Sequence, residues 1–397
     1  MSSSRIVVVG GGLVGCAAAL GLARQGFAVT LIEPRPPVAR AGRLGVDIRN
    51  VALNPQSREL LESLGVWSAD HAAPYTRMEV WEQWGTGHLD FAATDAGVDY
   101  LGWLVEMSPL HLALWAAVDA APAIEVMAAS IRDVSVAAGS VRVSTERGSV
   151  DACLLLAADG GNSPVRRALE VPVAEQALDQ VALATVVRTA QPHGAIARQR
   201  FLVEGPLALL PSVREDVVSI VWSQPRAHCE TRLALDEASF AEDLARASEH
   251  CLGGVLEVDE RFSFPLSQQH VADAIAHDGV VFLGDAMRVV HPLAGLGVNL
   301  GFEDVAALLA VTAQVRDAQE LFPARTWRSY ARTRHGRSLA MVHGLDALRR
   351  FYGQTHPLLG LLRNAGVGLV ARTPALKRQL MREAMGLGPL ARAGTPH

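Results

Sequence analysis

The chain has 397 residues, half of them hydrophobic, and a formal net charge of −5. This length allows two domains or one large α/β domain with an insertion, and the hydrophobic content excludes an intrinsically disordered protein. The four cysteines are scattered without metal-ligand spacing, no run of 18 uncharged apolar residues occurs, and the first expected strand leaves no room for a signal peptide. We therefore expect a cytoplasmic protein with reduced cysteines and no metal site.

The N-terminal stretch RIVVVGGGLVGCAAALGLARQGFAVTLIEP predicts a nucleotide-binding turn between a strand and a helix. The apolar residues 5–10 are typical of a buried strand, and the alanine- and leucine-rich residues 13–25 favour a helix. The turn carries a G-x-G-x-x-G pattern made by Gly10, Gly12 and Gly15. Such glycines allow a tight turn and the close approach of a pyrophosphate, whose charge the helix N-terminus favours. Glu33 follows the next apolar run, residues 29–32, where an acid is expected to bind a ribose.

The next regions predict one short helix and a strand-rich part. Asn54 and Pro55 are typical of an N-cap and a first helical position, and this helix should end before Gly65. Residues 74–99 and 181–264 contain alternating, turn-punctuated stretches such as VVSIVWSQP, which indicate a strand-rich second domain. Four tryptophans could line an aromatic site, although buried tryptophans more often belong to the core: Trp81, Trp84, Trp103 and Trp222.

Two further strands are expected to end in polar turns. In VDACLLLAADGGNSPVRRAL, an apolar strand should end at Asp159, and the following turn contains Ser163 and Arg166. Another strand, residues 280–283, should end at Gly284-Asp285 and lead through a glycine-rich loop into a helix over residues 299–310. Either aspartate alone is more simply a turn residue or a helix cap. Because ligands gather at the carboxyl ends of strands in open α/β sheets, the three motifs together predict one extended ligand.

Positive charge is concentrated near the C-terminus. Residues 325–382 contain twelve arginines and lysines against the single acid Asp346, although the whole chain is acidic. Residues 356–381 mix leucines and valines with these basic residues, as do helices that lie on an anionic surface without spanning it. The alternative is that the leucines pack on the protein itself and the arginines are solvated. Nucleic acid is not expected, because no nucleic-acid-binding motif accompanies the arginines.

Taken together, these motifs resemble those of FAD-dependent aromatic monooxygenases of the p-hydroxybenzoate hydroxylase type. The pattern is G-x-G-x-x-G near the start, D-G-x-N-S-x-V-R in the middle and G-D-A…H-P-L-A-G-x-G-x-N-L-G later. Within this type the chain is similar to the ubiquinone-biosynthesis hydroxylases, through VALNPQSRELLESLGVW, QRFLVEGPLALLP and the tail LLRNAGVGLVARTPALKRQLMREAMGL. Two positions depart from the family pattern: Leu296 stands where glutamine is usual, and Met287-Arg288 where alanine followed by histidine is common.

The resemblance implies an α/β (α+β) fold, in which a Rossmann-like FAD-binding domain carries an inserted strand-rich substrate domain and a C-terminal helical region. The FAD-binding domain would comprise residues 1–73, 100–180 and 265–330, the substrate domain residues 74–99 and 181–264, and the helical region residues 331–397. NAD(P)H would reduce the FAD, and O₂ would then give a flavin hydroperoxide that hydroxylates a polyprenylated phenol in ubiquinone biosynthesis. So apolar a substrate implies a peripheral position at the inner face of the membrane and contacts with other ubiquinone-biosynthesis proteins.

The resemblance also implies roles for individual residues. The first motif would line the FAD pyrophosphate with Gly10, Gly12, Leu13, Val14 and Gly15. Glu33 would hold the adenosine ribose, and Arg49 would lie against the flavin nucleotide. Asp159 would help to hold FAD and the nicotinamide nucleotide, with Arg166 as its ordering partner, and Asp285, after Gly284, would bind the ribityl chain. The loop beside the flavin ring would consist of Pro292, Gly295, Leu296, Gly297, Val298 and Asn299.

Neither the motifs nor the resemblance assigns a catalytic base. His291 is more readily a structural histidine of its loop than a catalytic one. The helix that begins near Asn299 would stabilise the negative charge of reduced flavin. Several functions stay open beside the ubiquinone-biosynthesis hydroxylase: another FAD-dependent aromatic hydroxylase, a polyprenyl reductase on the same scaffold, or a non-catalytic FAD-binding subunit of a biosynthetic complex. A halogenase is disfavoured, because the sequence lacks a W-x-W-x-I-P stretch.

Overall fold

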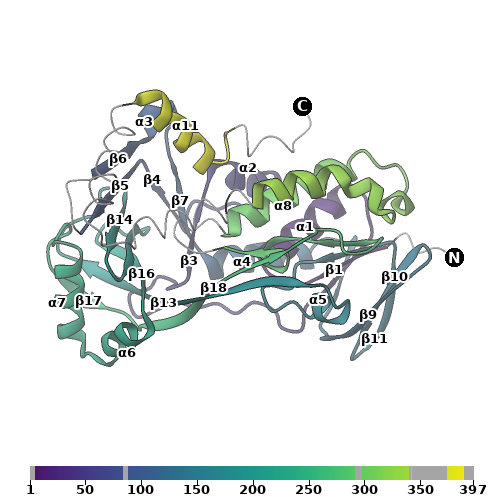
Figure 1. The fold of residues 1–397 in the computed structure, drawn as a ribbon, viewed down its shortest axis with the longest axis horizontal. Helices are drawn as coiled ribbons and strands as arrows, with labels where there is room; N and C mark the ends of the chain where they lie inside the picture. The colour runs from purple at the N-terminus through teal and green to yellow at the C-terminus, as the bar shows by residue number, and fades with distance from the viewer. Residues whose placement is uncertain (1–4, 84–87, 291–296, 339–340, 342–372, 389–397) are drawn as a thin grey trace.

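The structure is a computed structural model that describes residues 5–83, 88–290, 297–338, 341 and 373–388. A parallel sheet forms the centre of one half of the molecule (Figure 1). Its strands lie in the order β19–β12–β1–β2–β8, with bounds Val280–Phe282, Leu154–Ala157, Ile6–Val9, Val29–Ile32 and Ile124–Met127. Every side chain of β1 is buried, because β12 and β2 flank it and helices cover the sheet. The helices α1 (Leu13–Arg24) and α4 (Met107–Asp119) contact the sheet, and α8 (Gly297–Thr312) packs against α1.

The strands and helices predicted for the N-terminal motif and for residues 54–65 are confirmed. The predicted strand, helix and strand are β1, α1 and β2. The second predicted helix is α2 (Pro55–Ser63), where the Asn54 side chain accepts the backbone N–H of Ser57 at 2.8 Å. Gly65, with φ of +67°, adopts the left-handed conformation that favours glycine after a helix.

The apolar strand expected to end at Asp159 is β12, which ends two residues earlier, and the residues before it form a separate strand. β11 (Gly148–Ala152) belongs to a three-stranded antiparallel sheet with β9 (Ile131–Ala137) and β10 (Ser140–Thr145), whereas β12 joins the parallel sheet. The chain passes from one sheet to the other at the buried Cys153. The helix expected over residues 299–310 is α8, which begins two residues earlier and ends two residues later.

The other half of the molecule is built on a large, mostly antiparallel sheet (Figure 1). Its path is β20–β18–β13–β16–β15–β14–β5–β6, and β17 pairs with β13. The bounds, in that order, are Arg288–Val289, Phe262–Val271, Val173–Thr189, Val217–Gln224, Gly205–Pro211, Ile196–Leu202, Arg77–Glu82, His88–Ala92 and Val255–Val258. Helices α6 (Arg226–Ala234) and α7 (Glu237–Ala247), which the sequence did not predict, pack on one face of the sheet.

The two long strands of this sheet connect the halves of the molecule. In Figure 1, β13 and β18 run from the sheet beside α6 and α7 to the region of α5 (Pro164–Ala168). The domain boundary expected between residues 180 and 181 falls inside β13. A third, small sheet has the order β3–β7–β4, with bounds Asn50–Leu53, Gly102–Glu106 and Ala72–Tyr75. The domain division itself stays a prediction.

The candidate tryptophans do not share one environment. Trp222 is fully buried in the core between the large sheet and α6 and α7, and Trp103 lies in the core beside the parallel sheet. The Trp81 indole N–H donates to Glu249 at 3.0 Å, and Trp84 lies outside the described residues. For Trp103 and Trp222 the structure therefore supports the core interpretation.

The described part of the C-terminal region contacts the rest of the protein. After the 3-10 turns η3 (Ala318–Leu321) and η4 (Ala324–Trp327), residues 328–338 are helical, and α11 (Pro374–Ala384) packs on α3 (Ala93–Ala96). Met381 and Met385 are buried beside Ala93. The leucines of residues 356–370 lie outside the described residues. Within the described chain, no helix is both long and apolar enough to cross a membrane.

Candidate functional site

The three predicted turns lie together at one edge of the parallel sheet. They follow β1, β12 and β19, which are neighbouring parallel strands, so their carboxyl ends point the same way. A Cβ atom on Gly10 would lie 2.4 Å from the carbonyl oxygen of Ala158, which shows how closely the first two turns approach. Val14 lies against Gly284 and against Gly301 of α8. Residues from widely separated parts of the chain thus form one edge, where α/β proteins bind ligands.

The glycines of the first turn have different physical roles. Gly10 has φ of +101°, and a Cβ on Gly15 would lie 1.9 Å from the carbonyl oxygen of Gly10, so the backbone itself requires glycine at both positions. Gly12, in contrast, has an extended backbone, and a Cβ there would meet no protein atom within 4 Å. As the N-cap of α1, it has no side chain that could bond the first N–H groups of the helix. An anion such as pyrophosphate fits this arrangement.

A cavity of about 560 Å³ opens beside this turn. Its lining includes four predicted residues: Gly10, Gly12, Glu33 and, from the second turn, Asp159. One Glu33 oxygen accepts the N–H of Gly11 at 2.7 Å, and the other accepts the N–H of Arg35 at 3.1 Å. These bonds fix the carboxylate after the end of β2, where it lines the cavity.

Several residues of this cavity were not found from the sequence. Residues 129–131 and Arg167 also line it. His111 of α4 contacts the turn through its Nε2, which lies 2.6 Å from the carbonyl oxygen of Gly11. Arg167 could have been suspected, since it directly follows the middle motif, but a histidine inside an apolar helical run carries no such signal.

The second turn positions Asp159 through the start of α5. One Asp159 oxygen accepts the N–H of Val165 at 2.9 Å, and burial raises the pKa of this carboxyl although that bond opposes the shift. Arg166, expected to order Asp159, donates instead to the carbonyl oxygens of Gly161 and Ala286 and to the side chain of Gln269. Arg166 therefore connects the second turn to the third, rather than pairing with Asp159.

The third turn is the short 3-10 element η1 (Gly284–Ala286). The Gly284 N–H donates to Asp304 of α8 at 2.9 Å, and this holds the turn against the helix. The Asp285 side chain is open to solvent, yet the protein around it desolvates the carboxyl and raises its pKa, with Arg288 opposing and Asp304 adding to the shift. An acid that a ligand can reach inside a protein-lined space suits a hydrogen bond to a hydroxyl group.

The start of α8 faces the same edge, but its Asn299 side chain is directed to protein partners. Its oxygen accepts the Asn54 N–H at 2.9 Å and the Ser57 hydroxyl at 2.7 Å, and its amide donates to Ala52 at 2.6 Å. Asn299 thus joins α8 to α2, while Gly297 and Val298 form the first turn of the helix. Pro292, Gly295 and Leu296, as well as His291, lie outside the described residues.

Arg49 precedes β3 and keeps much of its side chain exposed. Its guanidinium donates to the Ser108 hydroxyl at 3.2 Å, and its backbone N–H donates to the buried Asp47 at 2.9 Å. Asp47 also accepts the N–H and the hydroxyl of Ser108. The loop is therefore fixed, while the guanidinium stays accessible to an anionic ligand.

Comparison with known proteins decides which nucleotide this edge binds. The family model of the FAD binding domain matches residues 3–343. The chain belongs to this FAD-binding family. Its cofactor is FAD. The open space in front of Gly12 fits the pyrophosphate of that molecule, and the adjoining cavity fits its nucleoside part. The enzyme is an FAD-dependent monooxygenase, as predicted.

Several curated relatives match the chain over nearly its full length. The 3-demethoxyubiquinol 3-hydroxylase of Escherichia coli is 32% identical, with 97% of this chain and 99% of that protein covered. The ubiquinone hydroxylase UbiL of Rhodospirillum rubrum is 31% identical, covering 97% and 90%. The human ubiquinone biosynthesis monooxygenase COQ6 is 28% identical, covering 95% and 91%.

Solved structures confirm the predicted fold class. The p-nitrophenol 4-monooxygenase PnpA from Pseudomonas putida superposes with a TM-score of 0.75 at 19% identity, covering 97% of this chain and 98% of that one. Klebsiella pneumoniae HpxO complexed with FAD and uric acid has a TM-score of 0.73 at 18% identity, and 97% of each chain is covered.

Proposed function

We propose that this enzyme hydroxylates the aromatic ring of a polyprenylated phenol in ubiquinone biosynthesis, with O₂ as oxygen source and NAD(P)H as electron donor. The observation that carries the proposal is the 32% identity to the 3-demethoxyubiquinol 3-hydroxylase of E. coli, over 99% of that protein. Relatives named for ubiquinone hydroxylation also occur in R. rubrum and in animals. A shared substrate class explains similarity that extends through the substrate half and the tail as well as the cofactor motifs.

The arrangement of polar groups supports specific roles toward FAD. The N-terminus of α1, with Gly10, Gly12, Leu13, Val14 and Gly15, would hold the pyrophosphate, and Glu33 the adenosine ribose. Asp285 would accept a hydroxyl of the ribityl chain, and Arg49 would lie near the flavin nucleotide. Asp159, with Arg166 and Gly284 fixing the adjacent turns, would border the same cofactor. Bound FAD supplies the oxygen-activating chemistry, and these residues orient it and keep its polar parts paired.

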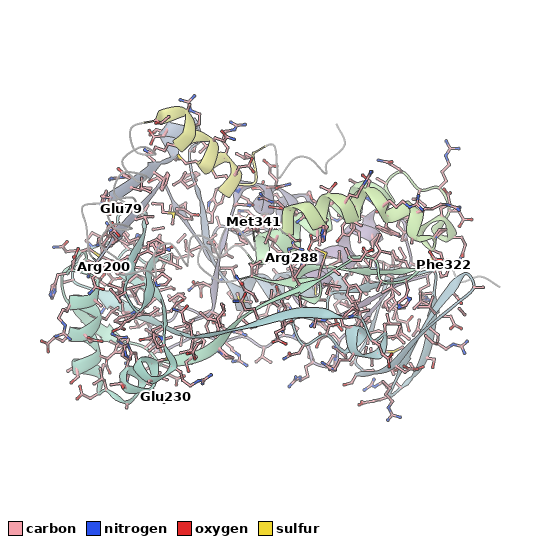
Figure 2. The ribbon with its side chains drawn as sticks, in the orientation of Figure 1. Glu79, Arg200, Glu230, Arg288, Phe322 and Met341 are labelled. Atoms are coloured by element: carbon pink, nitrogen blue, oxygen red, sulfur yellow. The ribbon has the colours of Figure 1, made fainter. Side chains whose placement is uncertain are left out.

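The large sheet offers an apolar face toward this cofactor site. Val80 of β5 and Phe201 of β14 pack with Val290, with Leu300 of α8 and with Met341. Figure 2 labels Met341 and Arg288 in the middle of the molecule. On the same face, away from α6 and α7, residues such as Leu210 and Val221 are only half-buried. Partly exposed apolar side chains beside the start of α8 are suited to an apolar substrate.

Isotope labelling tests the reaction. We expect one oxygen atom from ¹⁸O₂ in the hydroxylated product when the purified holoenzyme receives NAD(P)H and a short-chain polyprenyl phenol, because oxygen activation at FAD uses molecular oxygen. Mass spectrometry of the product is the measurement, with H₂¹⁸O as the control label. Label from water contradicts the proposal. A product reduced in its prenyl chain identifies a polyprenyl reductase, and no substrate-stimulated NAD(P)H oxidation identifies a non-catalytic subunit.

Substrate delivery leads to a second proposal, that the C-terminal region binds an anionic membrane surface reversibly. Residues 356–381 combine apolar and basic side chains, and each basic residue near such a surface contributes about 1 kcal/mol. Lys377 forms an ion pair with Asp95 at 2.6 Å, and Arg378 donates to the Asp95 carbonyl, so these two hold α11 on the protein. Arg382 is exposed, and Arg372 precedes the helix.

Liposome sedimentation tests membrane binding. We expect Arg372→Gln/Arg382→Gln to lower the fraction bound to anionic liposomes severalfold, since two attractive charges are lost. The matched control is Arg132→Gln/Arg147→Gln, which removes two exposed arginines from the sheet of β9–β11. Binding by the parent should require anionic lipid and fall with added salt. Equal sedimentation of the parent and the tail variant, with FAD bound, would show that the tail is only structural.

A further inference from the structure

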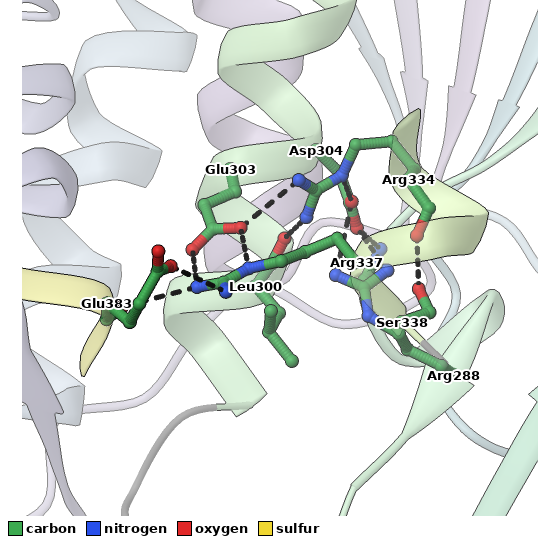
Figure 3. A network of polar contacts seen from close by, with 9 residues as sticks. Arg288, Leu300, Glu303, Asp304, Arg334, Arg337, Ser338 and Glu383 are labelled. Carbon is green, nitrogen blue, oxygen red and sulfur yellow. Dashed lines mark hydrogen bonds and ion pairs between the residues drawn. The ribbon is translucent and has the colours of Figure 1, made fainter. Parts of the chain in front are cut away.

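A buried network of charges connects the cofactor turn to the C-terminal helix. Arg288, just after η1, forms two bonds to Asp304 of α8, at 2.9 and 3.1 Å. Arg334, in the helical residues 328–338, donates to both Asp304 and Glu303 at 2.6 and 3.1 Å. Arg337, one turn later, contacts Glu303 through two nitrogens at 3.3 Å. All five side chains are buried, and Figure 3 shows them converging on one side of α8.

The network reaches the cofactor site through Asp304. Asp304 Oδ2, which accepts one of the two Arg288 bonds, also accepts the Gly284 N–H at 2.9 Å. Gly284 has φ of +55° and directly precedes Asp285, so this bond fixes the turn that presents the Asp285 carboxyl. Arg334 donates to the carbonyl oxygen of Leu300 as well, in the first turns of α8. A shift of Asp304 would therefore move both the turn and the start of the helix.

The charges of the network balance only when α11 is included. Arg288, Arg334 and Arg337 carry three positive charges, whereas α8 contributes two carboxylates, Glu303 and Asp304. Among the described residues, the third carboxylate of the network is Glu383, whose Oε2 lies 3.5 Å from Arg337. Arg337 also donates to the Glu383 carbonyl oxygen at 3.4 Å. An unbalanced charge in a buried position is costly, so the network favours the docked position of α11.

Other contacts place α11 where Glu383 can reach Arg337. Met381 and Met385 are buried beside Ala93 and Leu101, and Lys377 pairs with Asp95 at the opposite end of the helix. Figure 1 shows α11 beside α3, across from the start of α8. The helix therefore contacts the substrate half through its methionines and the cofactor half through Glu383.

We propose that docking of the C-terminal helix α11 through Glu383 strengthens FAD binding, because it holds Asp304 and the Gly284–Asp285 turn in place. Glu383 is thus a positioning residue that acts on the cofactor site without touching it. Any event that separates α11 from the protein, including contact of the basic C-terminal residues with an anionic membrane, would weaken FAD binding. The proposal depends on FAD binding and not on the identity of the phenol.

The test is the rate at which the diluted holoenzyme releases FAD, followed by the rise in flavin fluorescence. We expect Glu383→Gln, which keeps the side-chain size, to release FAD about tenfold faster, within the 5–150-fold range typical of coupled sites. Arg337→Gln should also accelerate release, because it leaves an unbalanced negative charge. The double variant Arg337→Gln/Glu383→Gln restores the balance, and its rate should return to within about twofold of the parent.

Two controls separate charge balance from packing and from net charge. Glu242→Gln makes the same carboxylate-to-amide change at an exposed position of α7 and should leave the release rate unchanged. Hydrogen exchange of residues 374–388 should rise in Glu383→Gln and fall again in the double variant. An unchanged release rate in Glu383→Gln overturns the proposal. So does a double variant that releases FAD as fast as the faster single variant, because that result indicates lost packing instead of charge imbalance.

Discussion

Gly12→Val is expected to yield a folded protein that has lost FAD, with an affinity at least about a hundredfold weaker, or roughly 3 kcal/mol. Gly12 has φ of −72° and an extended ψ, a conformation open to any residue, and its Cβ position meets no protein atom within 4 Å. The valine Cβ therefore has room, and the expected cost to the protein is limited to a poorer helix N-cap. It occupies the space in front of the first N–H groups of α1, where the pyrophosphate would lie.

Gly15→Ala provides the contrast that makes this result interpretable. Its Cβ would lie 1.9 Å from the Gly10 carbonyl oxygen, so it should destabilise the strand–turn–helix unit as well as FAD binding. The measurements are flavin absorbance of the purified proteins and far-UV circular dichroism. Gly12→Val should match the parent in circular dichroism while being colourless. Full retention of FAD by Gly12→Val would show that the cofactor does not approach the helix at this glycine.

The sequence was sufficient to predict the parts of the fold that depend on local backbone rules. Gly10 and Gly15 are required by the turn itself, and Asn54 and Pro55 mark the start of α2 by bonding and by a fixed φ. The meeting of the three turns at one sheet edge also followed from the pattern, because each turn comes directly after an apolar strand. In each case the information lies within a few residues.

Long-range partners could not be predicted in the same way. Arg334 and Arg337 were counted among the solvated or surface-binding charges of the tail, yet both are buried in ion pairs with α8. The free positive charge of the tail is accordingly smaller than its composition indicates. Arg166 was expected to order Asp159 because of the family resemblance, but its donors are taken up by Ala286 and Gln269, more than 100 residues away. Only the packing of separate elements determines such partners.

Asp304 is a position where a single substitution should strongly destabilise the protein. Its carboxylate is fully buried and accepts bonds from Arg288, from Arg334 and from the Gly284 N–H. Burial opposes the charge on Arg334, but attraction by Asp304 and Glu303 outweighs that effect and raises the pKa of the guanidinium. Asp304→Ala removes this attraction and leaves two buried guanidinium groups short of a counter-charge.

We therefore expect Asp304→Ala to lower the free energy of unfolding by about 3–5 kcal/mol, the cost of removing one partner of a buried ion pair. The matched control is Asp151→Ala, which removes an equally close but exposed pair with Arg142 and should cost less than about 1 kcal/mol. Urea unfolding followed by tryptophan fluorescence, at one fixed FAD concentration, measures both. Equal losses in the two variants would mean that burial adds nothing to the Asp304 interactions. The expected difference would instead identify Asp304 as the residue through which the cofactor turn, α8 and the C-terminal helices are stabilised as one unit.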